Sequence, residues 1–237
     1  MTQTLLAVSG LDVVEAGAWM VREVSLQVDR HSVLAVMGGS GAGKSALLET
    51  LAGRLPPIRG QIMLGGRPVA RLDANQRLKL GMALAPQRPA LFHGLTVAEH
   101  LALGVVKSRS GEAGARSRVL RVLPELAGRA GTVAQSLGPA ERRLLDIGRA
   151  LMSAPDLLLL DEPSLDLAPE RLAGLLAALR DEEVTVVIAE RFIGSTLAAA
   201  DAGILMIAGR IVASGSPGAV YADPRLEPAC MGELGPP

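Results

Sequence analysis

The sequence feature that most restricts the fold is a glycine-rich segment, GGSGAGKS, between an apolar run and a helical pattern. From Gly38 to Ser45 it has the spacing GxxxxGKS, and the apolar run VLAVM precedes it. A strand that ends in such a loop and continues into a helix surrounds an anion with backbone N–H groups and the positive end of the helix dipole. The segment therefore predicts a phosphate-binding loop in an α/β fold.

The residues of this loop favour a nucleoside triphosphate with Mg²⁺ as the ligand. The ammonium of Lys44 would reach the β- and γ-phosphates, and the hydroxyl of Ser45 would ligate Mg²⁺. A glycine-rich turn without a ligand is the alternative, and the preceding strand and following helix weigh against it. The expected ATP-binding residues are Gly38, Gly39, Ser40, Gly41, Ala42, Gly43, Lys44, Ser45 and Ala46.

An acidic pair follows the apolar run LLLL at 157–160, which fits a strand buried on both faces. Ligands of parallel sheets gather at the carboxyl ends of the strands, where Asp161 and Glu162 would lie. Asp161 would hold Mg²⁺ through its water shell, and Glu162 would polarise the attacking water as general base. Two solvated acids at an ordinary strand end are the alternative, which the phosphate loop disfavours.

Composition excludes several classes of protein. The chain has 237 residues with 24 basic and 24 acidic side chains, so no excess of positive charge argues for a nucleic-acid partner. Cys230 is the only cysteine, which excludes an internal disulfide and makes an inert thiol the expectation. No apolar run approaches the roughly 18 residues of a membrane span, and the start lacks a signal-peptide pattern. We therefore expect a cytoplasmic protein.

Strands and helices alternate along the chain. LLAVSG and EVSLQV predict strands near the N-terminus, GMALA predicts a strand at 81–85, and GILMIAGRIVASG predicts a hairpin that turns at Ala208 and Gly209. The pattern is helical from Thr96 to about Gly138, apart from a polar loop at 107–118, and another helix is expected at about 139–153. Met82, Met152 and Met206 lie in apolar runs and are expected in the core.

These elements predict one domain over residues 1–237. Its core would comprise residues 1–87 and 156–237, with a small antiparallel β portion near the N-terminus. Residues 88–155 would form a helical subdomain.

The ordered set of motifs resembles the nucleotide-binding subunit of ABC transporters over essentially the whole chain. Gln87, after GMALA, matches the Q-loop glutamine, and Ser164, Leu165 and Asp166 match the D-loop. LLDIGRALMSAPDLLLLDEPSLDLAP and RPALFHGLTVAEHLALG are similar to the branched-chain amino-acid importer group, whose relatives also serve urea and amides. The resemblance implies a P-loop NTPase fold of the ABC ATPase type.

The resemblance also implies a function and partners. A dimer of such subunits hydrolyses ATP on the cytoplasmic face of membrane permease subunits, which a solute-binding protein supplies. Ser45, Gln87 and Asp161 would hold Mg²⁺, and the D-loop would cross to the second ATPase subunit. Leu91, Phe92 and Leu95 would either receive a coupling helix of the permease or staple the helical insert internally. The resemblance implies neither the solute nor whether the dimer is homomeric.

Two positions depart from the family's pattern. Glu15 stands where the family has an aromatic residue that stacks on adenine, and Trp19 would either replace it or pack within its strand. Arg191 stands at the switch position, where the family has His or Gln. A guanidinium can contact a γ-phosphate but cannot accept a proton, so Arg191 either stabilises charge there or turns to solvent.

The signature segment departs most. Where the family has LSGGQ or LSGGE, this chain has Leu137, Gly138, Pro139, Ala140 and Glu141. Gly138 has no hydroxyl, Pro139 has no N–H, and Ala140 adds a Cβ, although proline suits the first turn of a helix. Either the helix simply begins at Pro139, or the chain works in an asymmetric pair with a sister ATPase whose signature is intact. An alternative function is a regulatory subunit that binds ATP but hydrolyses it poorly.

The histidines do not suggest a metal site. His31, His93 and His100 lack metal-ligand spacing to one another or to carboxylates. His93 and His100 flank Leu95 and are expected at the surface or at an interface.

Overall fold

The structure is a computed structural model that describes residues 3–106, 111–192 and 194–233. The strands are β1 Thr4–Glu15, β2 Ala18–Asp29, β3 Val33–Met37, β4 Arg59–Leu64, β5 Arg67–Pro68, β6 Met82–Ala85, β7 Leu157–Asp161, β8 Thr185–Glu190, β9 Ala202–Ile207 and β10 Arg210–Gly215. The helices are α1 Lys44–Leu51, α2 Ala74–Lys79, α3 Val97–Leu103, α4 Gly111–Val122, α5 Pro139–Leu151, α6 Pro169–Asp181, α7 Gly194–Ala199, α8 Pro217–Tyr221 and α9 Leu226–Met231. Short 3₁₀ turns cover Pro124–Arg129, Ala134–Ser136 and Pro163–Leu165.

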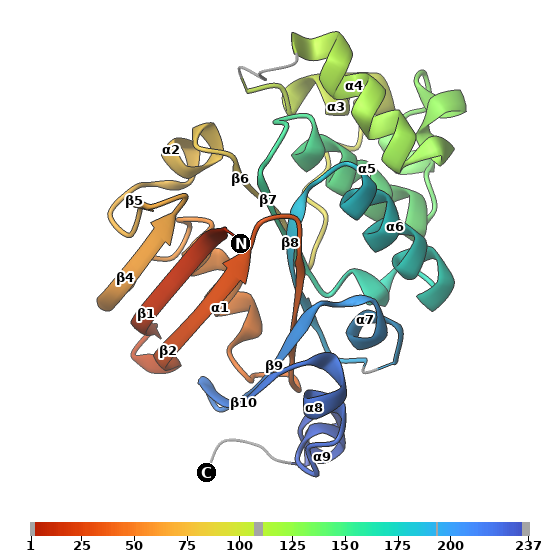
Figure 1. The fold of residues 1–237 in the computed structure, drawn as a ribbon. Helices are drawn as coiled ribbons and strands as arrows, with labels where there is room; N and C mark the ends of the chain where they lie inside the picture. The colour runs from red at the N-terminus through yellow and green to blue at the C-terminus, as the bar shows by residue number, and fades with distance from the viewer. Residues whose placement is uncertain (1–2, 107–110, 193, 234–237) are drawn as a thin grey trace.

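Two sheets form the framework of the described chain (Figure 1). One has the strand order β10-β9-β3-β8-β7-β6. Adjacent strands in it run parallel, except that β9 and β10 are antiparallel to each other. The other has the order β2-β1-β4-β5 and is antiparallel. This arrangement confirms the predicted P-loop type of α/β fold with a small antiparallel β portion.

The parallel sheet separates two hydrophobic cores. Its strands β3 and β7 are buried along their whole length, as continuous apolar runs in parallel sheets usually are. Because side chains alternate along a strand, Val33, Ala35 and Met37 pack with the helical side, while Leu34 and Val36 pack with α1 and the antiparallel sheet. Figure 1 shows α5, α6 and α7 on one side of this sheet and α1 on the other. Met82, Met152 and Met206 are buried, as predicted.

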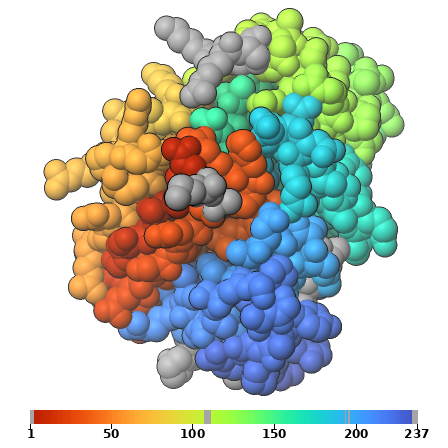
Figure 2. All heavy atoms as spheres, viewed as in Figure 1, coloured from red at the N-terminus to blue at the C-terminus, as the bar shows by residue number. Residues whose placement is uncertain are grey.

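The described residues of 88–155 contain the helices α3, α4 and α5. Figure 2 shows this part as the green lobe across the molecule from the orange N-terminal sheet. The prediction of a polar loop at 107–118 was wrong for residues 111–118, which belong to α4; residues 107–110 lie outside the described chain. The helix buries Ala115, Val119 and Val122 on one face. This apolar stripe is hidden in the sequence among arginines and small residues.

The C-terminal hairpin forms as predicted. Strands β9 and β10 pair antiparallel, and the residues between them, Ala208 and Gly209, have φ of 46° and 80°. Positive φ at both central residues is typical of the tight turns that match strand twist.

One prediction about the histidines was wrong. His93 is exposed, but His100 is fully buried. Its Nε2 accepts a hydrogen bond from the backbone N–H of Phe92 at 2.9 Å, and its Nδ1 lies 2.9 Å from the carbonyl oxygen of Thr96. The imidazole therefore ties α3 to the loop before it, because a buried ring nitrogen needs a partner.

Candidate active site

The phosphate-binding loop leaves β3 at Gly38 and enters α1 at Lys44. Gly43 has φ of 97°, and a Cβ on it would lie 2.2 Å from the carbonyl oxygen of Met20. A Cβ on Gly38 would lie 2.5 Å from the carbonyl oxygen of Met206. Glycine is therefore required at both ends of the loop. No side chain caps the start of α1, and its first turn holds no acid, so its N–H groups present a positive end to a ligand.

Lys44 lies inside the loop, with 3% of its surface exposed. Its ammonium donates to the carbonyl oxygens of Gly38 at 2.8 Å and Gly39 at 2.9 Å. It also lies 2.9 Å from Oε1 of Glu162. A buried ammonium needs such partners because its removal from water is otherwise costly. A phosphate oxygen at this place would take over one of these contacts.

Glu162 follows β7 and is 4% exposed. Its backbone is left-handed, with φ of 45° and ψ of 51°, which a non-glycine residue adopts at a strain of about 1–3 kcal/mol. One carboxylate oxygen contacts Lys44, and the other accepts a hydrogen bond from Nε2 of Gln87 at 2.9 Å. The structure thus brings the carboxyl ends of β3, β6 and β7 together at three side chains that the sequence singled out.

Asp161 ends β7 beside the loop and is 3% exposed. Burial raises the pKa of its carboxyl, which a hydrogen bond from the Ser45 side chain partly offsets. Its Oδ1 is buried and has no hydrogen-bond partner among the described residues. A buried carboxylate oxygen without a partner, next to a serine hydroxyl, fits an oxygen-ligated Mg²⁺.

The altered signature lies at the start of α5. Gly138 is the cap residue and Pro139 the first helical residue. The N–H of Gly138 donates to Oε2 of Glu141 at 2.9 Å, and Oε1 of the same carboxylate lies 2.9 Å from Nη2 of Arg129. Leu137 is buried beneath the turn, whereas Ala140 is exposed. The carboxylate of Glu141 therefore caps the N–H of Gly138, which precedes the helix, and Pro139 contributes no N–H to the first turn.

The D-loop is engaged within its own chain. Ser164 donates from its backbone N–H, at 2.9 Å, and from its hydroxyl to the carboxylate of Glu190. Asp166 accepts from Arg143 of α5 at 3.1 Å, and Leu165 is 47% exposed. Of the three, Leu165 is the residue most available to another molecule.

Arg191 follows β8 and is partly buried. Its guanidinium carbon lies 5.9 Å from the centre of the Phe192 ring. Its Nε is buried and has no hydrogen-bond partner within the described chain. This buried donor leaves the guanidinium with bonding capacity after the end of β8.

Neither candidate for adenine stacking forms a packed platform. Glu15 is exposed and lies opposite Ala18 in the β1–β2 pairing. Trp19 lies opposite Val14 and is 50% exposed, with the Arg22 guanidinium carbon 5.8 Å from its ring centre. Trp19 thus does not pack into the core through its strand.

Sequence reasoning missed two charged residues around the site. Glu190 is fully buried at the carboxyl end of β8, and burial raises the pKa of its carboxyl. Its place beside β7 in the parallel sheet was the available signal. Arg143 is 1% exposed and contacts the Q-loop and the D-loop. No local pattern marks it, because its partners lie 23 and 57 residues away in sequence.

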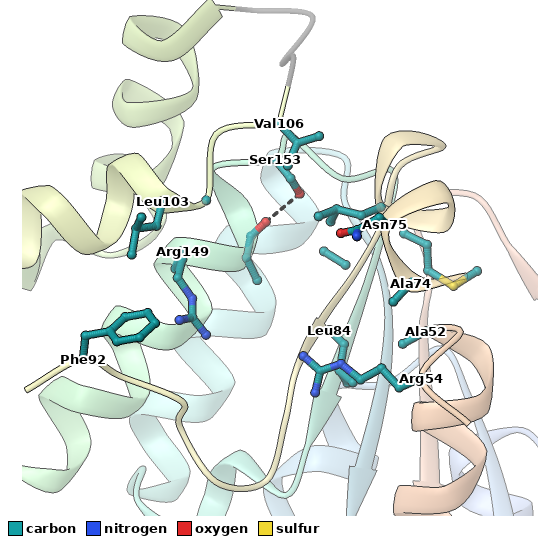
Figure 3. A pocket seen from close by; sticks show the side chains of 15 residues that line it. Ala52, Arg54, Ala74, Asn75, Leu84, Phe92, Leu103, Val106, Arg149 and Ser153 are labelled. Atoms are coloured by element: carbon teal, nitrogen blue, oxygen red, sulfur yellow. Dashed lines mark hydrogen bonds between the residues drawn. The ribbon is translucent and has the colours of Figure 1, made fainter. Parts of the chain in front are cut away.

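A groove of about 400 Å³ lies between α1 and α2 on one side and α3 and α5 on the other (Figure 3). Phe92 and Leu103 line it and are 61% and 54% exposed. Arg54 and Arg149 also line it, and Figure 3 shows them on opposite walls. Phe92 is therefore not an internal staple, although Leu91 packs against the core.

Comparisons with known proteins agree with this architecture. The sequence profile of the ABC transporter family matches residues 21–165. The high-affinity branched-chain amino acid transport ATP-binding protein BraG of Pseudomonas aeruginosa is 34% identical over 90% of this chain and 93% of BraG. The lipopolysaccharide export system ATP-binding protein LptB of Acidithiobacillus ferridurans is 29% identical over 90% of this chain and 91% of LptB. The ADP conformation of MJ1267, an ATP-binding cassette, superposes over 98% of this chain with a TM-score of 0.85 at 22% identity.

The chain belongs to the ABC transporter family. It is an ATP-binding cassette with ATPase activity. Among the described residues, no helix combines the length and apolarity that crossing a bilayer requires.

Proposed function

We propose that this chain is the ATP-hydrolysing subunit of an importer of the branched-chain amino-acid type, which takes up an amino acid, urea or an amide. BraG, at 34% identity over nearly the whole chain, supports this solute class. The chain would bind permease subunits at the cytoplasmic face of the membrane as a peripheral protein. A solute-binding protein would deliver the solute to those permeases. The balanced charge gives no reason to expect a nucleic-acid partner.

One observation carries the proposal: Lys44, Gln87 and Glu162 form a continuous set of contacts, each of 2.9 Å, at the carboxyl ends of three parallel strands. The buried, unpartnered oxygen of Asp161 and the Ser45 hydroxyl lie at the same edge. A phosphate cradle, a general base and oxygen ligands for a metal are the parts that phosphoryl transfer to water requires.

The resting contacts suggest how hydrolysis begins. Both carboxylate oxygens of Glu162 are engaged, one by Lys44 and the other by Gln87. When triphosphate enters the loop, the ammonium of Lys44 turns to its β- and γ-oxygens and releases one oxygen of Glu162. That oxygen can then accept a proton from the attacking water while Gln87 orients it. Ser45, Asp161 and Gln87 would hold Mg²⁺, which would supply neutralising charge. Arg191 adds a cation to the same strand ends.

The groove beside α3 suits a docking helix of a permease. It offers apolar contacts from Phe92 and Leu103 and guanidinium groups from Arg54 and Arg149. Arg149 is anchored by hydrogen bonds to the Ala90 carbonyl at 2.6 Å and to Asp146. Motion of this groove relative to the parallel sheet would transmit hydrolysis to the membrane.

The start of α5 supports an asymmetric pair over a homodimer with two equal sites. Gly138 has no hydroxyl and Pro139 contributes no N–H, so this helix offers fewer donors to the nucleotide of a partner than an intact signature would. A second ATPase with an intact signature would complete the site at Lys44 of this chain. The same observation also favours, as a second candidate, a subunit that binds ATP and hydrolyses it poorly.

Lys44→Ala tests the proposed nucleotide site. Loss of one charge-assisted contact should weaken Mg·ATP binding by about tenfold to a hundredfold in equilibrium titration. Lys79→Ala on α2, which is exposed, is the matched control and should bind as the unaltered chain does. Equal affinity of all three proteins would contradict the assignment of the loop.

The solute class is tested by uptake of labelled leucine, urea and acetamide in cells that lack this chain. The unaltered chain should restore uptake of one of these solutes, and Lys44→Ala should not. Restoration of none of them, with Mg·ATP binding intact, would contradict the importer type while leaving the ATPase in place.

A further inference from the structure

Arg143 is a buried arginine that belongs to none of the motifs recognised in the sequence. It lies on α5, two residues after Glu141, and is 1% exposed. A guanidinium stays charged in proteins, so its burial is tolerated only where hydrogen bonds and an opposite charge compensate it. The partners of Arg143 therefore identify the parts of the structure that its burial stabilises.

The partners of Arg143 are the two loops that border the catalytic carboxylate. Its Nη1 donates to the carbonyl oxygen of Pro86 at 2.6 Å, and its Nη2 donates to the carbonyl oxygen of Gln87. Its Nε donates to Oδ2 of Asp166 at 3.1 Å, and Asp166 keeps 25% of its side chain exposed. One side chain of α5 thus fixes the Q-loop backbone and the D-loop carboxylate together.

These contacts continue to the phosphate-binding loop. Gln87, whose carbonyl Arg143 holds, donates through its side chain to Glu162 at 2.9 Å, and Glu162 pairs with Lys44 at 2.9 Å. The side chain of Gln87 can reach the reacting atoms only from a correctly placed backbone. A displacement of about 1 Å in such a group can lower a rate by about a hundredfold.

We infer that Arg143 is a positioning residue for ATP hydrolysis. It holds Gln87 within hydrogen-bond distance of Glu162. The position of Gln87 then depends on how α5 packs against the parallel sheet. The inference rests on the proposed function. The rigid fork of the guanidinium matches two adjacent carbonyls and a carboxylate, and a lysine ammonium cannot reproduce that geometry.

A purely structural role is the rival explanation, and the chain contains a matched case. Arg77 is also 1% exposed and donates to the carbonyl oxygens of Thr50, Leu51, Ala70 and Leu72. None of those carbonyls belongs to the Q-loop, the D-loop or the phosphate-binding loop. Arg77→Gln therefore measures what the loss of a buried, carbonyl-bound arginine does by itself.

The test compares Arg143→Gln, Arg143→Lys and Arg77→Gln in the full chain by steady-state hydrolysis of Mg·ATP and by thermal unfolding. Arg143→Gln should lower kcat by about tenfold to a hundredfold with KM changed by less than about threefold. Arg143→Lys should recover part of kcat. Arg77→Gln should lower the melting temperature and leave kcat of the folded protein unchanged. Unchanged kcat in Arg143→Gln, or an equal fall in Arg77→Gln, would overturn the inference.

A second measurement needs no turnover and covers a variant that folds poorly. Hydrogen exchange of the backbone amides of Gln87 and Arg88 should slow on addition of Mg·ATP in the unaltered chain, and it should slow less in Arg143→Lys. Equal slowing in both proteins would count against the inference. Failure of the proposed function would look different, because the unaltered chain would then bind Mg·ATP no more tightly than Lys44→Ala does.

Discussion

The two loop-to-helix junctions at the starts of α1 and α5 are built from similar parts and differ in what they leave free. At α1 the cap residue Gly43 has φ of 97°, no acid lies in the first turn, and a buried lysine follows. At α5 the cap residue Gly138 is extended, with φ of −68° and ψ of 167°, proline follows, and Glu141 of the first turn accepts the Gly138 N–H. The first junction offers free N–H groups and an ammonium, whereas the second lacks one N–H at Pro139 and has a carboxylate beside its cap.

The difference shows that a helix N-terminus is not enough to define a phosphate site. Both helices have a positive dipole end, but of the two only α1 follows a glycine-rich loop and begins with a buried lysine. At α5 the carboxylate of Glu141 and its partner Arg129 neutralise each other at the same place. We therefore expect the catalytic work of this chain to fall on the α1 side.

The largest expected effect comes from Glu162→Gln, which removes the proposed base on the α1 side. Hydrolysis should fall by about 10²- to 10⁴-fold, the usual contribution of general acid–base catalysis, while Mg·ATP still binds. Single-turnover hydrolysis and equilibrium titration separate the two. Glu183→Gln is a matched control, because Glu183 is exposed and also has a left-handed backbone, with φ of 58°. If Glu162→Gln hydrolyses ATP at the rate of the unaltered chain, Glu162 is not the base. The contrast between the α1 and α5 sides would then lose its catalytic meaning.

A small fall in the melting temperature is expected from Glu182→Gln. The change weakens the packing of the helical side of the molecule, to which α5 also belongs. Arg121 and Arg118 of α4 hold the pKa of Glu182 below its usual value of 4.5. Because the folded-state pKa is lowered, this ion pair stabilises the fold fully above pH 4.5, and its contribution is lost as the pH falls through the lower pKa. The variant should melt slightly lower at neutral pH, and the difference should vanish in acid. A difference that does not depend on pH would contradict this account.

The sequence predicted the elements that depend on local chemistry. The loop from Gly38 to Ser45 needs only neighbouring residues and its flanking strand and helix, so it could be identified without a structure. The same holds for the buried run before Asp161 and for the turn at Ala208 and Gly209. In each case residue type and spacing specify the backbone.

The features that escaped prediction depend on distant partners. The sequence predicts His100 at the surface, whereas in the structure its ring contacts the backbones of Phe92 and Thr96 and is buried. The role of Arg143 could not be predicted from the sequence, because it depends on the packing of α5 against the Q-loop and D-loop. The capping of Gly138 by Glu141 could have been predicted from the sequence, because an acid three residues after a cap is a known helix-start pattern.

The central claim is that the start of α1 grips phosphate and the start of α5 does not. The most direct measurement is the rate of Mg·ATP hydrolysis by the purified chain alone, unaltered and with the triple change Gly138→Ser, Pro139→Gly and Ala140→Gly. Regained donors at α5 should let two copies of the chain complete each other's sites and raise the rate by about tenfold or more. A rate that stays the same or falls in the folded variant would contradict the account.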